Sequence, residues 1–116
     1  MGGAMLEGLV AQHLRAWNAY RNKKYEIYFW RSRGGLEVDF VLYGETGIYA
    51  FEVKNSLRVR EQDLRPLRAF QADYPQSRAV LLYRGKERLL KKNILCLPCE
   101  AFLRNLSPER DLHSLL

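Results

Sequence analysis

Apolar residues recur at helical spacing through the first twenty positions. Residues separated by three or four places fall on one face of a helix, so Ala4 to about Arg21 is predicted to form an amphipathic helix. His13 lies on this apolar stripe, and we interpret it as a hydrogen-bonded packing residue and not as a catalyst. The residues of the stripe are Leu6, Leu9, Val10, His13, Leu14, Trp17 and Tyr20.

The pattern then changes to alternation between apolar and polar residues. Residues 25–32, 36–43 and 48–54 are rich in β-branched and aromatic side chains, which favour strands. Glycines lie between these stretches, at Gly34-Gly35 and within 44–47, and suit tight hairpin turns. The sequence therefore predicts an antiparallel meander of three strands.

The second half alternates between helix and strand signals. A helix is predicted from an N-cap at Asp63 to Tyr74, with Pro66 in its first turn. The apolar run 78–83 predicts a strand covered on both faces, and 88–97 predicts one further strand. A last helix is expected from Pro98 to Leu106, followed by a frayed end. The inner face of the middle helix is predicted to carry Leu64, Leu67, Phe70 and Tyr74.

The order of the predicted elements indicates the fold class. The 116 residues suffice for one domain and not for two, so 1–116 is taken as a single domain. A helix between the third and fourth strands implies a crossover connection. We therefore predict an α/β domain whose mixed sheet is flanked by helices.

Acidic residues interrupt the alternation of the second and third strands. In the second strand, Leu36, Val38, Phe40 and Leu42 are predicted to share one face, with Glu37 and Asp39 on the other. If Tyr43 pairs with Ile48 across the turn, Asp39 stands opposite Glu52, and Lys54 follows one step along the same face. The sequence thus predicts two adjacent carboxylates and a lysine on the sheet.

Like charges directly opposite each other destabilise a sheet unless a cation lies between them. Mg²⁺ keeps several waters, so Asp39, Glu52 and the backbone carbonyl of Val53 would suffice as protein ligands. Such an ion lowers the pKa of a bound water, and Lys54 would orient that water or neutralise a phosphate transition state. The alternative from spacing alone is a solvated sheet face.

The motif and its setting resemble the PD-(D/E)xK nuclease-like core, also called the restriction-endonuclease-like core. Asp39 and Glu52-Val53-Lys54 lie behind a helix that carries Glu7, and the element order is similar over residues 4–97. The resemblance implies Asp39 and Glu52 as ligands of Mg²⁺ or Mn²⁺, Lys54 as the catalytic lysine, and Glu7 as an acid that assists the metal. Val38 stands where the name of that core has proline.

Several segments more narrowly resemble the C-terminal domain of a prokaryotic AAA+-type ATPase family. They are LEGLVAQHL, YFWRSRGGLEVDFVL, FEVKNS, LRAFQADYP and LLYRG. The resemblance implies an upstream ATPase module as partner, so the chain would be the C-terminal part of a larger protein. No G-x-x-x-x-G-K-[ST] occurs in the 116 residues, so this chain is not itself the ATPase.

Charge and composition add a candidate partner. The net charge of +6 favours a polyanion, and Arg31, Arg33, Arg58 and Arg60 are candidates for contacts to a nucleic-acid backbone, expected to be DNA. No apolar run reaches the roughly 18 residues of a membrane span, so we expect a cytoplasmic protein without a membrane partner. Cys96 and Cys99 are interpreted as reduced thiols, because no second pair completes a zinc site.

Three functions remain open from the sequence. The first is a metal-dependent nuclease domain that hydrolyses phosphodiesters. The second is a catalytically inactive module of the same fold that binds nucleic acid or a partner, or regulates its ATPase. The third is a structural or dimerisation domain, in which the chain forms a homo-oligomer and the acids lie on a wet sheet face.

Overall fold

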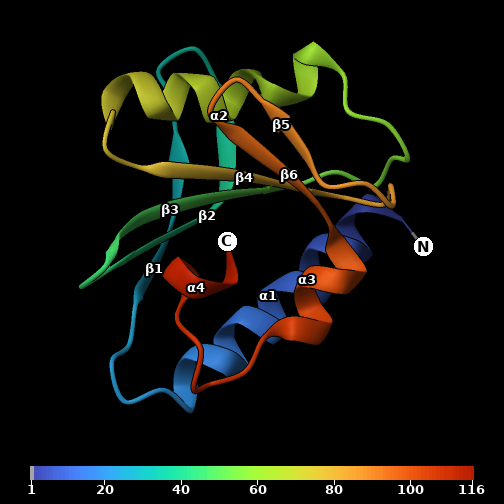
Figure 1. The fold of residues 1–116 in the computed structure, drawn as a ribbon. Helices are drawn as coiled ribbons and strands as arrows, with labels where there is room; N and C mark the ends of the chain where they lie inside the picture. The colour runs from blue at the N-terminus through green and yellow to red at the C-terminus, as the bar shows by residue number, and fades with distance from the viewer. Residues whose placement is uncertain (1) are drawn as a thin grey trace.

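A six-stranded mixed sheet separates two layers of helices (Figure 1). The structure, a computed structural model, describes residues 2–116. Helix α2 covers one face of the sheet and the other three helices cover the opposite face, as Figure 1 shows with the sheet nearly edge-on. The strands are β1 (Glu26–Arg31), β2 (Glu37–Gly44), β3 (Gly47–Val53), β4 (Arg78–Tyr83), β5 (Leu89–Lys91) and β6 (Ile94–Pro98). The helices are α1 (Gly3–Ala19), α2 (Glu61–Asp73), α3 (Cys99–Asn105) and α4 (Leu112–Leu115).

The strands lie in the order β1-β2-β3-β4-β6-β5. The first three pair antiparallel, as the hairpin glycines predict, and β4 pairs parallel with both β3 and β6. The connection from β3 to β4 passes through α2, which is the crossover expected from a helix between parallel strands. The predicted α/β class and mixed sheet are confirmed.

Helix α1 buries the apolar stripe that the sequence predicts. Leu6, Val10, Leu14 and Trp17 lie in the core between α1 and the sheet. His13 lies at the border of this stripe and is exposed, and its Nδ1 atom is 2.9 Å from the carbonyl oxygen of Leu9. The His13 ring therefore forms a hydrogen bond within α1.

The predicted N-cap of α2 is wrong by three residues. The helix begins at Glu61 with Arg60 as its N-cap, and Asp63 is its third residue. The Asp63 carboxylate accepts a hydrogen bond of 2.9 Å from the Arg60 backbone N–H, so the acid stabilises the helix start from inside the first turn. The predicted inner face is confirmed for Leu64, Leu67 and Phe70, which are buried, whereas Tyr74 is 40% exposed at the C-cap.

Strands β1 and β2 lose their regular register near the middle of β1. Tyr28 pairs with Val41, whereas Trp30 pairs with Val38. Two residues of β2 therefore lie opposite a single residue of β1, which defines a β-bulge. The two bulged residues are Asp39 and Phe40.

The bulge changes which side chains of β2 share a face. Val38 packs in the core on the α2 side of the sheet, whereas Phe40 and Leu42 pack on the α1 side. The predicted common face for these three residues is therefore wrong for Val38, because strict alternation holds only in a strand without a bulge. Asp39 lies at the point where the alternation breaks.

The prediction of one strand over 88–97 is also wrong. This stretch is a hairpin of β5 and β6, with β6 paired parallel to β4 and β5 at the sheet edge. Lys92 adopts a positive φ of 46° between the two strands. This left-handed residue reverses the chain where apolar periodicity alone gives no break.

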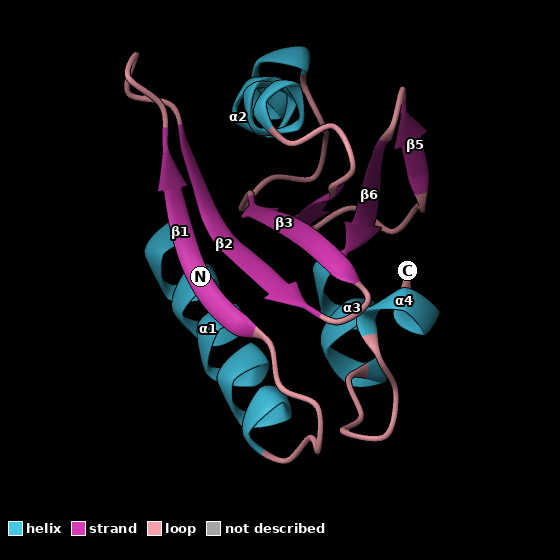
Figure 2. Cartoon of the chain, turned by 90° about the vertical axis from the view of Figure 1, so that its left-hand side faces the viewer, coloured by secondary structure: helices cyan, strands magenta, loops and turns pink. Residues whose placement is uncertain are grey.

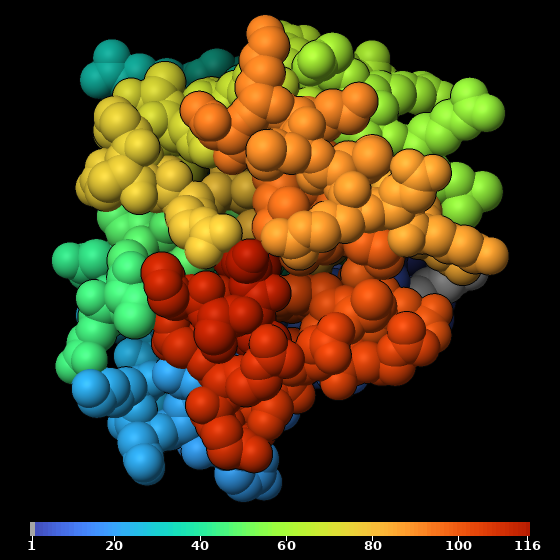
Figure 3. Space-filling model, in the orientation of Figure 1, coloured from blue at the N-terminus to red at the C-terminus, as the bar shows by residue number. Residues whose placement is uncertain are grey.

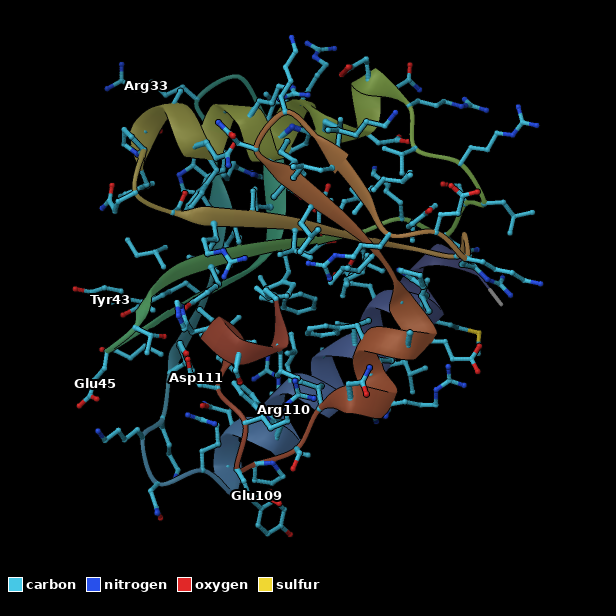
Figure 4. The ribbon with its side chains drawn as sticks, viewed as in Figure 1. Arg33, Tyr43, Glu45, Glu109, Arg110 and Asp111 are labelled. Atoms are coloured by element: carbon cyan, nitrogen blue, oxygen red, sulfur yellow. The ribbon has the colours of Figure 1, made fainter. Side chains whose placement is uncertain are left out.

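The end of the chain is packed and not frayed as predicted. Leu112 is fully buried, and the C-terminal segment lies against the β2–β3 turn (Figure 3). The Asp111 carboxylate accepts hydrogen bonds from the Tyr25 hydroxyl at 2.6 Å, the Thr46 hydroxyl at 2.8 Å and the Arg21 guanidinium at 2.9 Å. Asp111 thus joins three segments that lie far apart in sequence (Figure 4).

Candidate metal and nucleic-acid site

The register of β2 and β3 brings Asp39 and Glu52 together. The strands pair from Gly44 with Gly47 to Phe40 with Phe51, which confirms the predicted register. The backbone ladder stops there, and the next two residues would be Asp39 and Glu52. Beyond this point β3 pairs with β4 alone, through Val53 and Leu82.

Side chains replace the missing ladder bonds between the two strands. The Asp39 backbone N–H donates to Oε1 of Glu52 at 3.1 Å. The Val53 backbone N–H donates to Oδ2 of Asp39 at 2.8 Å. Each carboxylate therefore binds the backbone of the opposite strand, which fixes the two acids relative to each other.

The Glu52 carboxyl lies in an environment that disfavours its charge. The residue is 5% exposed, and its pKa is raised to about 8, chiefly by burial and also by the negative charge of Asp39 and a hydrogen bond between the two carboxyl groups. The Asp39 N–H and the Lys54 ammonium lower the pKa and only partly offset these effects. Below about pH 8 the Glu52 carboxyl is therefore mostly protonated. A cation beside the two acids would offset the same repulsion between their charges.

Lys54 follows β3 and extends its side chain toward Glu52. Its Nζ atom lies 4.0 Å from Oε2 of Glu52, and its side chain is 39% exposed. The Lys54 backbone N–H donates to the Leu82 carbonyl at 2.9 Å, so the neighbouring strand β4 fixes the start of this side chain. The ammonium group is therefore both close to the carboxylates and accessible to a ligand.

Glu7 reaches the same place from α1. Partial burial raises its pKa, and the Asp39 carboxylate raises it further through repulsion and a hydrogen bond, with a smaller contribution from Glu37. The sequence prediction that Glu7 lies close to the sheet acids is thus borne out in geometry.

The side chains fit a hard divalent cation with few protein ligands. Within residues 2–116, no group of three or more His, Cys, Asp or Glu side chains is arranged to hold a metal ion. Asp39 and Glu52 each use one oxygen for a backbone N–H, and Oε2 of Glu52 lies 4.0 Å from the Lys54 ammonium, so a cation would have to displace contacts that the carboxyl groups now make with each other and with Lys54. Two carboxylate oxygens, with water for the remaining positions, match the preference of Mg²⁺. The Val53 carbonyl stays a predicted third ligand.

The four predicted backbone-binding arginines lie on two separate surfaces. Arg31 forms a salt bridge with Glu37, so part of its charge is neutralised. Arg33 projects into solvent from the β1–β2 hairpin, beyond α2 (Figure 4). Arg58 and Arg60 are exposed on the loop that leads into α2.

The two thiols lie outside this site. Cys96 in β6 and Cys99 at the start of α3 are buried and free. Burial raises the pKa of the Cys99 thiol to about 11 and also raises that of Cys96. Both groups are therefore held as thiols and not as reactive thiolates.

Sequence reasoning missed a groove beside the carboxylates. It lies between α1 and β1 and is lined by Arg15, Tyr28 and Phe29 in addition to Glu7 and Asp39. Its helical wall could have been found from the small residues that share one helix face with Arg15. Its other wall could not, because the position of α1 against β1 is a tertiary feature.

The fold and site together define an α/β domain with a carboxylate pair and a lysine at the end of two neighbouring strands. Residues 2–102 match the family described as "Domain of unknown function (DUF4143)", and the chain belongs to this family. The family is often found as the C-terminal domain of AAA ATPases. No curated protein and no solved structure matches the chain. None of the helices in residues 2–116 has the length and apolar character to cross a membrane.

Proposed function

We propose that this domain is a metal-dependent nuclease module of the PD-(D/E)xK type, joined to an upstream ATPase in the full-length protein. One observation carries the proposal: Asp39, Glu52, Lys54 and Glu7 come from three elements and meet where the β2–β3 ladder ends. A structural sheet face gives no reason to bury Glu52 beside a second carboxylate, because the arrangement costs stability.

In this proposal Asp39 and Glu52 hold one divalent cation, Mg²⁺ or Mn²⁺. The ion would supply a polarised phosphate oxygen and a bound water of lowered pKa. The hydrogen bonds from the backbone hold both carboxylates in place before any ligand arrives, so only their contacts with each other and with Lys54 need to change.

The remaining residues would orient or deprotonate the attacking water and neutralise negative charge on the nucleic acid. The exposed Lys54 ammonium can move from its 4.0 Å separation from Glu52 toward an attacking water or a phosphate oxygen. Glu7, whose pKa is raised, is a stronger base than an ordinary glutamate and can accept a proton from the attacking water more readily. Arg33, Arg58 and Arg60 would bind the nucleic-acid backbone away from the reacting phosphate.

Relaxation of supercoiled plasmid DNA by the domain with Mg²⁺ or Mn²⁺ tests the proposal. Lys54→Ala should abolish cleavage and leave folding intact, because its side chain is partly exposed and makes no core contact. Asp39→Asn should abolish cleavage through loss of the metal. The matched control is Lys91→Ala. Lys91 is an exposed lysine of the edge strand β5, which β4 and β6 separate from β3, so this variant should cut as the wild type does.

The same assay separates the two nuclease-fold functions. If the wild type and both site variants cut at one trace rate, that rate is contamination, and the domain is the inactive binding module. If the isolated domain is silent but cuts when joined to its ATPase, and Lys54→Ala abolishes this, the enzyme is regulated by its partner.

A further inference from the structure

The groove between α1 and β1 leads from the molecular surface to the carboxylate site. Its volume is about 600 Å³, within the range of pockets that enclose a small ligand. Glu7 and Asp39, two of the proposed site acids, are among the residues that line it. Figure 2 shows α1 running along the same side of β1 and β2 over most of their length. A ligand in this groove would therefore lie beside Asp39, one of the proposed metal ligands.

The helical wall of the groove is formed by small residues. Ala4, Gly8 and Ala11 follow one another at spacings of four and three, so they share one face of α1. A Cβ atom added at Gly8 would meet no atom within 4 Å, which indicates open space at this point. A glycine inside a helix costs roughly 1 kcal/mol relative to alanine. The groove thus remains open at the expense of helix stability.

The opposite wall presents the aromatic ring of Phe29 to solvent. Tyr28 is 50% exposed and Phe29 is 73% exposed, on a strand that has a neighbour on only one side within residues 2–116. Exposed aromatic rings beside a basic residue are the usual platform on which unpaired bases stack. Phe29 faces this groove, whereas Tyr28 pairs with Val41, which packs on the α2 side, so the two neighbouring rings point to opposite faces of β1.

Arg15 supplies an available positive charge in the groove. It is exposed and forms no hydrogen bond or ion pair with any residue of the described range 2–116. Other arginines of the domain are already paired with acids: Arg21 with Asp111, Arg31 with Glu37, Arg68 with Glu61 and Arg104 with Glu100. Arg15 is therefore free to bind a phosphate.

We propose that this groove binds unpaired nucleotides of a single-stranded nucleic acid, with a base stacked on Phe29 and a phosphate on Arg15. The inference rests on the proposed function and names its substrate class. A strand held in this way brings a neighbouring phosphate close to Asp39, which lines the same groove. The groove has room for one or two nucleotides and not for a duplex, so a frayed end or a single strand is preferred.

Fluorescence anisotropy with a labelled oligothymidylate tests this inference. The domain is titrated in Ca²⁺, which offsets the charge of the carboxylates without supporting cleavage, and a hairpin duplex of equal length is the competitor. The wild type should prefer the single strand. Phe29→Ala should weaken its binding about 5- to 100-fold, the range for loss of one stacked base. Arg15→Gln should weaken binding and lower its dependence on salt.

A blocking variant removes folding as an explanation. Gly8→Leu fills the open space with a better helix former, so it should raise the melting temperature and still weaken binding by at least about tenfold. The controls are Tyr74→Ala, an exposed aromatic residue outside this groove, and Arg78→Gln, an exposed arginine of β4. Both should bind as the wild type does.

The inference is overturned if the groove variants bind within about twofold of the wild type, or if the duplex binds at least as tightly. It is also overturned if Phe29→Ala abolishes dimerisation in sedimentation while binding is unchanged, because a second copy would then cover the surface. These outcomes are independent of cleavage. If the groove variants weaken binding but the domain does not cleave, the inference stands and the nuclease proposal is rejected. If cleavage depends on Lys54 but the groove variants bind normally, the nuclease proposal stands and the inference is rejected.

Discussion

Replacing Glu52 with glutamine should stabilise the metal-free domain. The side chain is 5% exposed, and its pKa is raised from an ordinary 4.5 to about 8 by burial and by Asp39. An amide is uncharged, and its oxygen can accept the same hydrogen bond from the Asp39 N–H. Glu52→Gln therefore removes the charge and keeps the shape and the bond to the backbone.

The size of the effect follows from the proton that folding takes up. At about pH 7 the unfolded carboxyl is ionised and the folded one is mostly protonated, which costs folding about 3 kcal/mol at roughly 1.4 kcal/mol per pKa unit. Because the folded pKa is raised, the wild type is relatively most stable below 4.5 and loses stability as the pH rises through about 8. The advantage of Glu52→Gln should thus vanish at about pH 4 and reach about 5 kcal/mol above about pH 8.

Urea unfolding in EDTA measures this difference at several pH values. The fluorescence of Trp17 and Trp30, one on each side of the sheet, reports the transition. Glu100→Gln is the control, because the Glu100 side chain is 84% exposed and its stability change should stay within about 0.5 kcal/mol. A gap between Glu52→Gln and wild type that does not change with pH would refute the electrostatic reasoning. A less stable Glu52→Gln at about pH 7 would do the same.

Three further predictions concern the rest of the domain. Asp111→Ala should lower the free energy of unfolding by about 2–3 kcal/mol in chemical denaturation, because it removes the carboxylate that accepts from the buried Tyr25 hydroxyl, the Thr46 hydroxyl and Arg21; a loss below about 0.5 kcal/mol would mean that the C-terminal segment does not hold the turn. Binding to nucleic acid should weaken with salt, and Arg58→Gln or Arg60→Gln should each lower the slope of log affinity against log salt by about one, whereas Arg31→Gln should lower it less, because Glu37 already pairs with it; equal slopes for all three variants would contradict this. Neither Cys96 nor Cys99 should react with a thiol reagent in the native protein, and both should react in denaturant, because both are buried; rapid native labelling would show that the α3 end of the sheet opens.

Local chemistry made most of the fold predictable. The apolar stripe of α1, the three hairpin strands and the run 78–83 carry periodicities that burial enforces, and the structure has them close to the predicted bounds. The register of β2 and β3 follows from the turn at 44–47, since a slip by one residue would turn the apolar side chains of β3 to the wrong face. The meeting of Asp39 and Glu52 was therefore predictable.

Features that depend on distant contacts were not predictable. The apolar and polar pattern of the β2 sequence does not indicate the bulge at Asp39 and Phe40. The bulge nevertheless decides on which side of the sheet Val38 packs. The burial of Leu112 depends on a surface formed by α1 and the sheet, and the bonds of Asp111 reach Tyr25 and Thr46 from the end of the chain. Terminal sequence alone cannot show such partners.

Calorimetric titration of Mn²⁺ into the domain tests the central claim, that Asp39 and Glu52 hold one divalent cation. The wild type should bind one ion and release protons at about pH 7, because the ion displaces the proton that the pair holds. Lys54→Ala should bind with similar affinity, since lysine is not a ligand, and Asp39→Asn should lose binding. Equal binding heats for wild type and Asp39→Asn, or no binding heat in either at about millimolar ion, would contradict the metal site.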